Sequence, residues 1–353
     1  MIPLRRIGLF ALSLLASAVG PAWAERSQSL DVLIWPDYID PQVVEAFETE
    51  FDTDVRFSYF DSDEQRDKDL TASGGTGADV ILVNSVQMAR YVKRGWIAPL
   101  TLEAMPNLAH IAPRWTHAMD GATDGFGAAY FWGTLGIAWR GDLHPAGFSS
   151  WNDLLEPVPA LSGRILMNTS GRELVGFALK ADGHSANTVD RELIRTAGRK
   201  LARQKPFVRG YGYPSLTEAS SLVTGEVWAA PLYSGDALVL QAFEPALEYR
   251  LPDEGGLLWV DYLTVARASG HHDLAAAFVD FVNRPAVAAA NAEYVSFATP
   301  NEAARALVSP EYLADPVIHP SGAQLRGSEF LLPIPARSTK SVNTVMSELL
   351  TVQ

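Results

Sequence analysis

The chain has 353 residues, of which 48% are hydrophobic, and it carries a formal net charge of −13. Nucleic acids and anionic membrane surfaces are bound by clustered lysine and arginine, so this acidic balance argues against both partners and favours cationic ligands. The absence of cysteine excludes disulfides and thiolate chemistry, so the fold depends on packing alone.

The N-terminus has the three parts of an export signal. Arg5 and Arg6 form a basic start, residues 7–19 form an apolar run, and residues 22–24 (Ala-Trp-Ala) offer a small-residue cleavage site. The run is shorter than the roughly 20 residues of a membrane-spanning helix. We therefore expect a signal peptide over residues 1–24 and a mature protein in the periplasm. Removing 24 of the 353 residues leaves 329, enough for about two domains.

The first half of the mature chain alternates strands with helices. The pattern predicts strands over residues 30–35, 55–59 and 78–83, with helices starting at Pro41 and near Ser62 and another around Met88 and Tyr91. Strands separated by helices in this way form a parallel sheet.

A second unit of the same kind begins after about Trp139. Its predicted strands cover residues 164–167 and 227–233, and its predicted helices cover residues 172–180, 189–204 and 215–224. Two short strands follow, one around Trp259 and one over residues 262–266, and then helices over residues 273–283 and 285–294. Strand crossovers near residues 134–139 and 257–264 would join the two units as a hinge. A ligand cleft is then expected at the carboxyl ends of the strands.

Three segments place an aromatic residue within two or three positions of an acid at a predicted strand end. The segments contain Trp35, Asp37 and Tyr38, then Tyr233 and Asp236, then Trp259 and Asp261, and Glu173 begins a helix after a further strand. Each has an ordinary structural explanation, since aromatic residues at strand ends pack in the core and acids at helix starts complement the helix dipole. Their recurrence favours a binding site. Carboxylates would bind ammonium groups, and rings would cover methylenes and attract cations, as an organic dication requires.

Longer stretches of the sequence resemble the spermidine/putrescine-binding periplasmic proteins of ABC transporters, from about residue 30 to about residue 329. The similar segments are LIWPDYIDPQVVEAFE, GADVILVNS, AAYFWGTLGIAWR, ILMNTSGRELVGFAL, LYSGDA, EGGLLWVDYLTVA and FATPNEAAR. The resemblance implies an α/β, two-lobed type II periplasmic-binding fold, in which each lobe is a mainly parallel sheet flanked by helices and the ligand cleft lies between the lobes. The implied lobes are residues 25–136 with 260–308, and residues 137–259 with 309–353.

The same resemblance implies a set of ligand-binding residues. They are Trp35, Asp37, Tyr38, Asn84, Ser85, Ser170, Glu173, Tyr233, Asp236, Trp259, Asp261 and Phe297. The chain departs from the family at three positions: Ser170 stands where some members have an acid, Val86 where many have a tyrosine, and Leu331 roughly where spermidine binders have a glutamine. These departures leave the length of the polyamine open and allow another organic cation.

The resemblance implies a monomer that binds a polyamine and docks on an inner-membrane ABC permease. Some relatives instead act on the periplasmic domain of a membrane sensor, and the pocket residues do not separate the two roles. An exported enzyme is a third hypothesis, which the sequence disfavours because it offers no nucleophile, metal or cofactor motif. No cofactor and no metal are therefore expected, and His271 and His272 are expected to be solvated.

Overall fold

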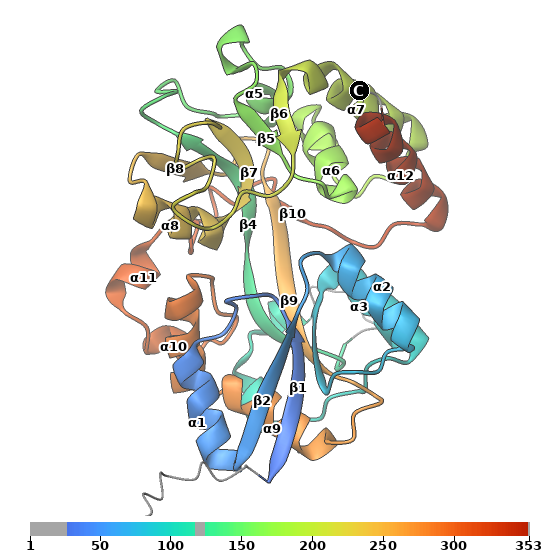
Figure 1. Ribbon diagram of the computed structural model, residues 1–353, viewed down its shortest axis with the longest axis vertical. Helices are drawn as coiled ribbons and strands as arrows, with labels where there is room; N and C mark the ends of the chain where they lie inside the picture. The colour runs from blue at the N-terminus through green and yellow to red at the C-terminus, as the bar shows by residue number, and fades with distance from the viewer. Residues whose placement is uncertain (1–26, 117–123, 352–353) are drawn as a thin grey trace, which may run out of the picture.

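The computed structural model describes residues 27–116 and 124–351, which form two lobes joined by long strands (Figure 1). Strands β4 (Ala128–Arg140) and β9 (Leu257–Val265) pair antiparallel and run from one lobe into the other. The predicted crossovers lie in these two strands, although β9 is a single strand where the sequence predicts two short ones. Strand β10 (Glu329–Phe330) pairs with β9 and adds a further connection. The expected signal peptide, residues 1–24, lies outside the described residues.

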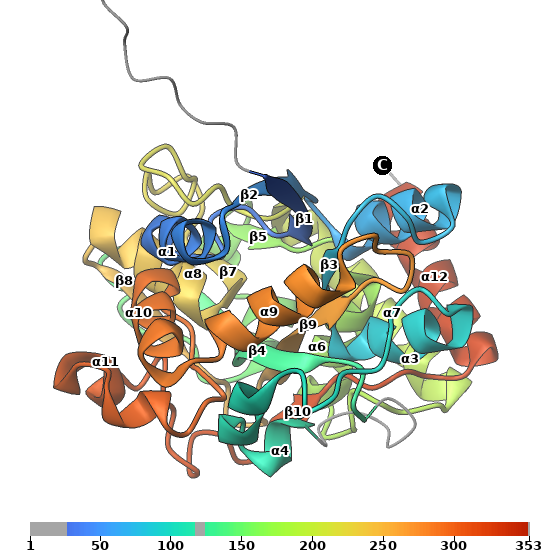
Figure 2. The same cartoon turned by 90° about the horizontal axis from the view of Figure 1, so that it is seen from below.

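The N-terminal lobe is built on parallel strands. Their order is β2-β1-β3, followed by the crossover strands β9 and β4, and β1 pairs in parallel with both of its neighbours. The bounds are β1 (Gln28–Ile34), β2 (Thr53–Tyr59), β3 (Val80–Asn84), α1 (Pro41–Phe51), α2 (Asp63–Ser73), α3 (Ser85–Arg94), α4 (Pro113–Thr116), α9 (His272–Val282) and α10 (Pro285–Val295). Helices α1 and α10 lie on one side of this lobe, and α2 and α3 lie on the other (Figure 2).

Side-chain caps start the helices that follow the first three strands. The carboxylate of Asp40 accepts the backbone N–H of Gln42 ahead of Pro41, and Ser62 and Asn84 cap α2 and α3 in the same way. These residues satisfy N–H groups that have no partner inside the helix. The caps fix where each loop from a strand enters its helix.

The second lobe continues the same sheet through β7, β5 and β6. Strand β5 pairs in parallel with β6 and β7, whereas β7 and β8 pair antiparallel with β4. The bounds are β5 (Ile165–Met167), β6 (Val208–Tyr211), β7 (Ala229–Tyr233), β8 (Leu247–Arg250), α5 (Trp151–Leu155), α6 (Gly171–Ala181), α7 (Arg191–Gln204), α8 (Ser234–Phe243) and α12 (Ala336–Thr351). Helix α12 packs on α6 and α7, whereas α11 (Pro310–Ala314) lies near α10 and packs Tyr312 in the N-terminal core (Figure 1).

The predicted helix over residues 215–224 is wrong, because this stretch forms turns. Its serine and threonine side chains bond locally: the Thr224 hydroxyl donates to the carbonyl of Ser221, and the Ser215 and Thr217 hydroxyls lie 3.4 Å apart. Such local bonds compete with helical ones. The helix in this part of the chain is α8, which begins directly after β7.

The buried side chains divide at the crossover strands. One cluster draws on residues between Leu30 and Trp132 and between Val260 and Ile318, and a second draws on residues between Leu135 and Leu257 and between Leu331 and Leu349. Each lobe therefore has its own core. The exact lobe boundaries stay a prediction. None of the helices within the described ranges has the length and hydrophobicity that a membrane crossing requires.

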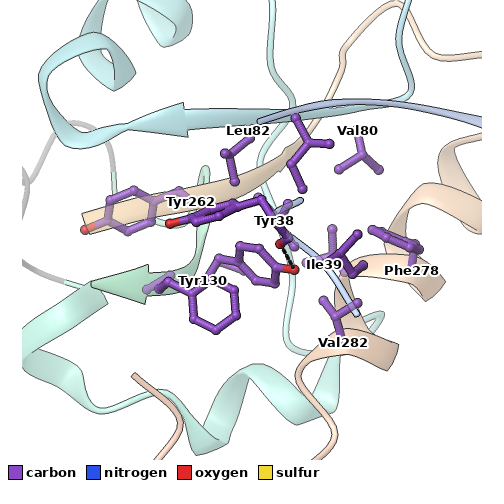
Figure 3. Close-up of a cluster of buried hydrophobic side chains, with 14 of the residues drawn as sticks. Tyr38, Ile39, Val80, Leu82, Tyr130, Tyr262, Phe278 and Val282 are labelled. Atoms are coloured by element: carbon purple, nitrogen blue, oxygen red, sulfur yellow. Dashed lines mark hydrogen bonds between the residues drawn. The ribbon is translucent and has the colours of Figure 1, made fainter. Parts of the chain in front are cut away.

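A buried hydrogen-bond chain anchors the loop between β1 and α1, and Figure 3 shows its link between Tyr130 and Tyr38. The Tyr130 hydroxyl donates to the Tyr38 carbonyl at 3.0 Å, and the Asn291 amide donates to the Tyr130 hydroxyl at 2.7 Å. The Asn291 carbonyl oxygen accepts the backbone N–H of Asp40 at 2.8 Å. Since all of these groups are buried, the chain holds Tyr38 in a fixed position.

Phe47 tests the packing of the N-terminal lobe. Its ring is fully buried, with the Phe51 ring 4.5 Å away and the Phe278 ring 5.0 Å away between centroids. We expect Phe47→Ala to lower the free energy of unfolding by about 3–5 kcal/mol in urea titrations, because a large cavity forms. Phe243→Ala is the control, since that ring is 48% exposed, and should change stability by less than about 0.5 kcal/mol. Equal losses in the two variants would contradict this description of the core.

Candidate functional site

A row of aromatic rings crosses the junction of the two lobes. Tyr38 from the β1–α1 loop lies 5.8 Å from Phe297, which lies 4.9 Å from Trp259 on β9. The row continues to Tyr233 at the end of β7, 5.9 Å from Trp259, and then to Tyr213 at 5.7 Å. All four distances are between ring centroids and lie in the range of aromatic pairing. The row brings together rings from segments far apart in the sequence.

Two glycines allow the rings to approach the backbone so closely. A Cβ atom on Gly133 of β4 would lie 2.6 Å from the Trp259 ring, and one on Gly235 of α8 would lie 2.5 Å from the Phe297 ring. Real side chains do not tolerate such contacts. The Gly235 contact also joins a helix of the second lobe to a ring that packs in the N-terminal core.

Asp261 is a buried carboxylate at the Tyr38 end of this row. It lies on β9 opposite Asn84 of β3, and its Oδ2 atom accepts a hydrogen bond from the Tyr38 hydroxyl at 3.2 Å. The Trp35 side chain also forms a hydrogen bond with it. Burial raises the pKa of Asp261 to about 7, and the nearby charge of Asp63 adds to the rise.

Glu173 and Asp236 lie at the Tyr233 end, each in the first turn of a helix. Glu173 of α6 accepts the Tyr233 hydroxyl at 2.8 Å and the side-chain amide of Asn168. Asp236 of α8 accepts the Tyr213 hydroxyl. Burial raises the pKa of Glu173 to about 7 and that of Asp236 to about 6.

None of these three carboxylates forms an ion pair with a lysine or arginine of the described chain. Their partners are tyrosine, tryptophan and asparagine groups, which donate hydrogen bonds without bringing a full positive charge. Burying negative charge without a cation is costly. A ligand with ammonium groups would supply the missing charge, and the aromatic row would cover its methylenes. Within the same part of the chain, no group of three histidine or acidic side chains is arranged to hold a metal ion.

Four predicted site residues do not join this network through their side chains. Asp37 is exposed, with φ of 54°, and lines a groove of about 300 Å³ beside α1 and β2, which Trp35 and Tyr38 line as well. The Asn84 side chain caps α3 and donates to Asp63, and the buried Ser85 is the first residue of α3. Ser170 precedes α6 without a capping hydrogen bond. Their roles in ligand binding stay predictions.

Sequence reasoning missed three residues of the network. Tyr213 follows β6, a strand that the sequence pattern did not predict. Asn168 directly follows β5, and a single polar residue at that position gave no signal of a binding role. Asp63 carried a usable signal, because Tyr59 and Phe60 precede it at the end of a predicted strand. That is the same aromatic-then-acid pattern that singled out the other segments.

A comparison with known protein families shows to which family of proteins the chain belongs. Residues 42–320 match the family model described as bacterial extracellular solute-binding protein. The chain belongs to this family. The family and the two-lobed fold class predicted from the sequence are thereby confirmed.

Several relatives cover most of the chain. It is 27% identical to the spermidine/putrescine-binding periplasmic protein of Escherichia coli over 332 residues, 94% of each protein. It is 32% identical to the norspermidine sensor of Vibrio cholerae over 293 residues, 81% of this chain and 79% of the relative. The crystal structure of a spermidine/putrescine ABC transporter substrate-binding protein from Streptococcus pneumoniae matches with a TM-score of 0.79 and 25% identity, over 92% of this chain and 99% of that one.

The raised pKa values predict that acid stabilises the ligand-free protein. An unfolded Asp or Glu has a pKa of about 4, so between about pH 4 and pH 7 the folded state binds more protons through Asp261, Glu173 and Asp236. The contribution of these groups to stability therefore falls as pH rises through this window. Urea unfolding of wild type and Asp261→Asn at pH 5 and pH 8 isolates one group. We expect the variant to gain stability relative to wild type at pH 8, and a pH-independent difference would contradict the assigned pKa.

Proposed function

We propose that this solute-binding protein carries a polyamine in the periplasm and delivers it to an inner-membrane ABC permease. The observation that supports this most strongly is a set of carboxylates from two lobes, the buried Asp261 and the partly buried Glu173 and Asp236, beside a continuous row of aromatic rings. Several relatives bear the names of polyamine-binding proteins. We propose no enzymatic activity for the site.

The chemistry of a polyamine suits this arrangement. Each charge-assisted hydrogen bond contributes about 1.5–3 kcal/mol, each cation over a ring about 0.5–2 kcal/mol, and each buried methylene about 0.8 kcal/mol. Binding also costs free energy, because the two molecules lose translational and rotational freedom and the ammonium groups lose water. This cost offsets several of the contributions above. A net value near −8 kcal/mol, a micromolar dissociation constant, is the expected balance.

Ligand contacts on both lobes would favour the closed form. Asp261 and Tyr38 belong to the N-terminal core region, whereas Glu173, Tyr233 and Asp236 belong to elements of the second lobe. A ligand that contacts both sets binds the closed form more tightly and shifts the equilibrium toward it. We propose that β4 and β9 act as the hinge, that cleavage after residue 24 releases the mature monomer, and that the permease recognises the closed form.

A sensor role is the second candidate, because the relative with 32% identity is a norspermidine sensor. The two roles share a ligand site and differ in the membrane partner. Adjacent permease and ATPase genes would support transport, and an adjacent gene for a membrane sensor with a periplasmic domain would support signalling. Stimulation of a reconstituted permease by the liganded protein tests the first role directly.

Titration calorimetry with putrescine and spermidine tests the proposed function. We expect micromolar binding to wild type and a loss of about 2–5 kcal/mol in Asp261→Asn, because a buried charge partner is removed. Asp253→Asn is the matched control, since Asp253 is an exposed acid that pairs with Arg250, and it should bind as wild type does. Absence of binding to the wild-type protein would overturn the proposal, and unchanged affinity in Asp261→Asn would remove that residue from the site.

A further inference from the structure

A fourth carboxylate lies beside the proposed site. Asp63 is the first residue of α2, after the capping residue Ser62, and its side chain is 28% exposed. The Asn84 side chain donates a hydrogen bond to its Oδ2 atom. Asn84 is the direct neighbour of Asp261 across the β3–β9 ladder. Asp63 is therefore hydrogen-bonded to Asn84, the β3 residue that pairs with Asp261, which is the most buried acid of the site.

A buried arginine fixes the direction of the Asp63 side chain. The Arg66 Nη2 atom lies 2.7 Å from Asp63 Oδ1, and the Arg66 side chain is only 1% exposed. Arg66 itself is held by the Tyr91 hydroxyl at 2.9 Å and by the Leu82 carbonyl at 3.3 Å. Held in this way by neighbouring groups, Arg66 keeps the Asp63 side chain in place.

The charge of Asp63 reaches both ends of the site. It raises the pKa of Asp261 in the N-terminal lobe and the pKa of Glu173 in the second lobe, and it acts on Tyr233 as well. Asp63 Oδ1 is enclosed beside Arg66 in an ion pair without a hydrogen bond, and Oδ2 accepts from Asn84. Because a carboxylate oxygen has two lone-pair positions, Oδ2 retains acceptor capacity.

An independent observation indicates that a hydrogen-bond donor is missing from the same region. Asn168 is 5% exposed, and its amide nitrogen donates to Glu173. Its Oδ1 atom is buried and has no hydrogen-bond partner in the described part of the chain. Buried carbonyl oxygens normally accept a hydrogen bond. We infer that a ligand amine bound at Glu173 supplies this donor, which requires the enclosed oxygen to become accessible on binding.

We propose that Asp63 binds the middle amine of a linear triamine, whose terminal amines are held by Asp261 and by Glu173 with Asn168. This inference rests on the proposed polyamine-binding function and specifies its ligand: triamines over diamines. Arg66 and Asn84 act as positioning residues for Asp63.

Two ligands of equal length test the role of the middle amine without any substitution. Spermidine and 1,8-diaminooctane have the same number of atoms between their terminal nitrogens, but the diamine has a methylene where spermidine has its central ammonium. We expect wild type to bind spermidine at least about tenfold more tightly in calorimetry, the worth of one charge-assisted hydrogen bond. Equal affinities would overturn the proposal while leaving the polyamine-binding function intact, and binding of neither ligand would overturn that function.

Asp63→Asn then assigns the preference to this residue. The substitution keeps the size of the side chain, and we expect the preference for spermidine over 1,8-diaminooctane to fall to within about threefold, because the loss of one charge-assisted contact removes about that tenfold difference. Retention of the full preference would overturn the proposal. A parallel weakening of both ligands would do so as well, because it would mean that Asp63 only neutralises Arg66.

Asp67→Asn is the matched control for long-range charge. Asp67 lies on the same helix, 3.9 Å from the same Arg66 atom, but its carboxylate accepts the Tyr91 hydroxyl on the far side of that arginine. We expect this variant to keep the wild-type preference. Thermal unfolding of both variants, with equal ligand-free midpoints within a few degrees, shows that each is compared in its folded state.

Discussion

Negative charge enclosed without a matching cation is the constraint on which this structure depends. Asp261 is buried and Glu173 and Asp236 are partly buried where the lobes meet, and among the described residues each accepts hydrogen bonds from neutral donors only. An ion pair within the chain would have stabilised them at lower cost. A cationic ligand would instead balance this charge, and the raised pKa values of the three carboxylates mean that protons compete with it.

The rest of the fold places these groups with little freedom. The crossover strands carry Trp259 and Asp261 on one continuous element, and Gly133 lets the indole lie against the neighbouring strand. The buried chain through Tyr130 fixes Tyr38 on the other side. Since the second lobe supplies Glu173 on a helix start, the proposed closure of the lobes would complete the site, and opening would separate its two halves.

The local sequence pattern was sufficient to predict the alternating strands and helices. Their hydrophobic periodicity and their helix-starting residues, such as Asp40 and Pro41, lie within short stretches of the chain. The same pattern singled out Glu173, which lies in the first turn of the helix after β5, and Asp261, although Asp261 lies inside the continuous strand β9 and not after a strand end. It could not assign residues 215–224, where serine and threonine side chains favour turns, nor the proximity of Asp63 to Glu173, which exists only once two lobes are packed. Asp37 shows the opposite limit: it lines a groove together with Trp35 and Tyr38, yet its side chain is exposed, whereas those two residues hydrogen-bond to the buried Asp261.

The central claim is that a cation replaces protons on these carboxylates. Calorimetry of spermidine binding near pH 7 in buffers of different ionisation enthalpy measures the protons exchanged. With Asp261 and Glu173 titrating at about 7, the account predicts net proton release that declines as pH rises above 8. Binding with the same heat in every buffer at pH 7 would contradict it.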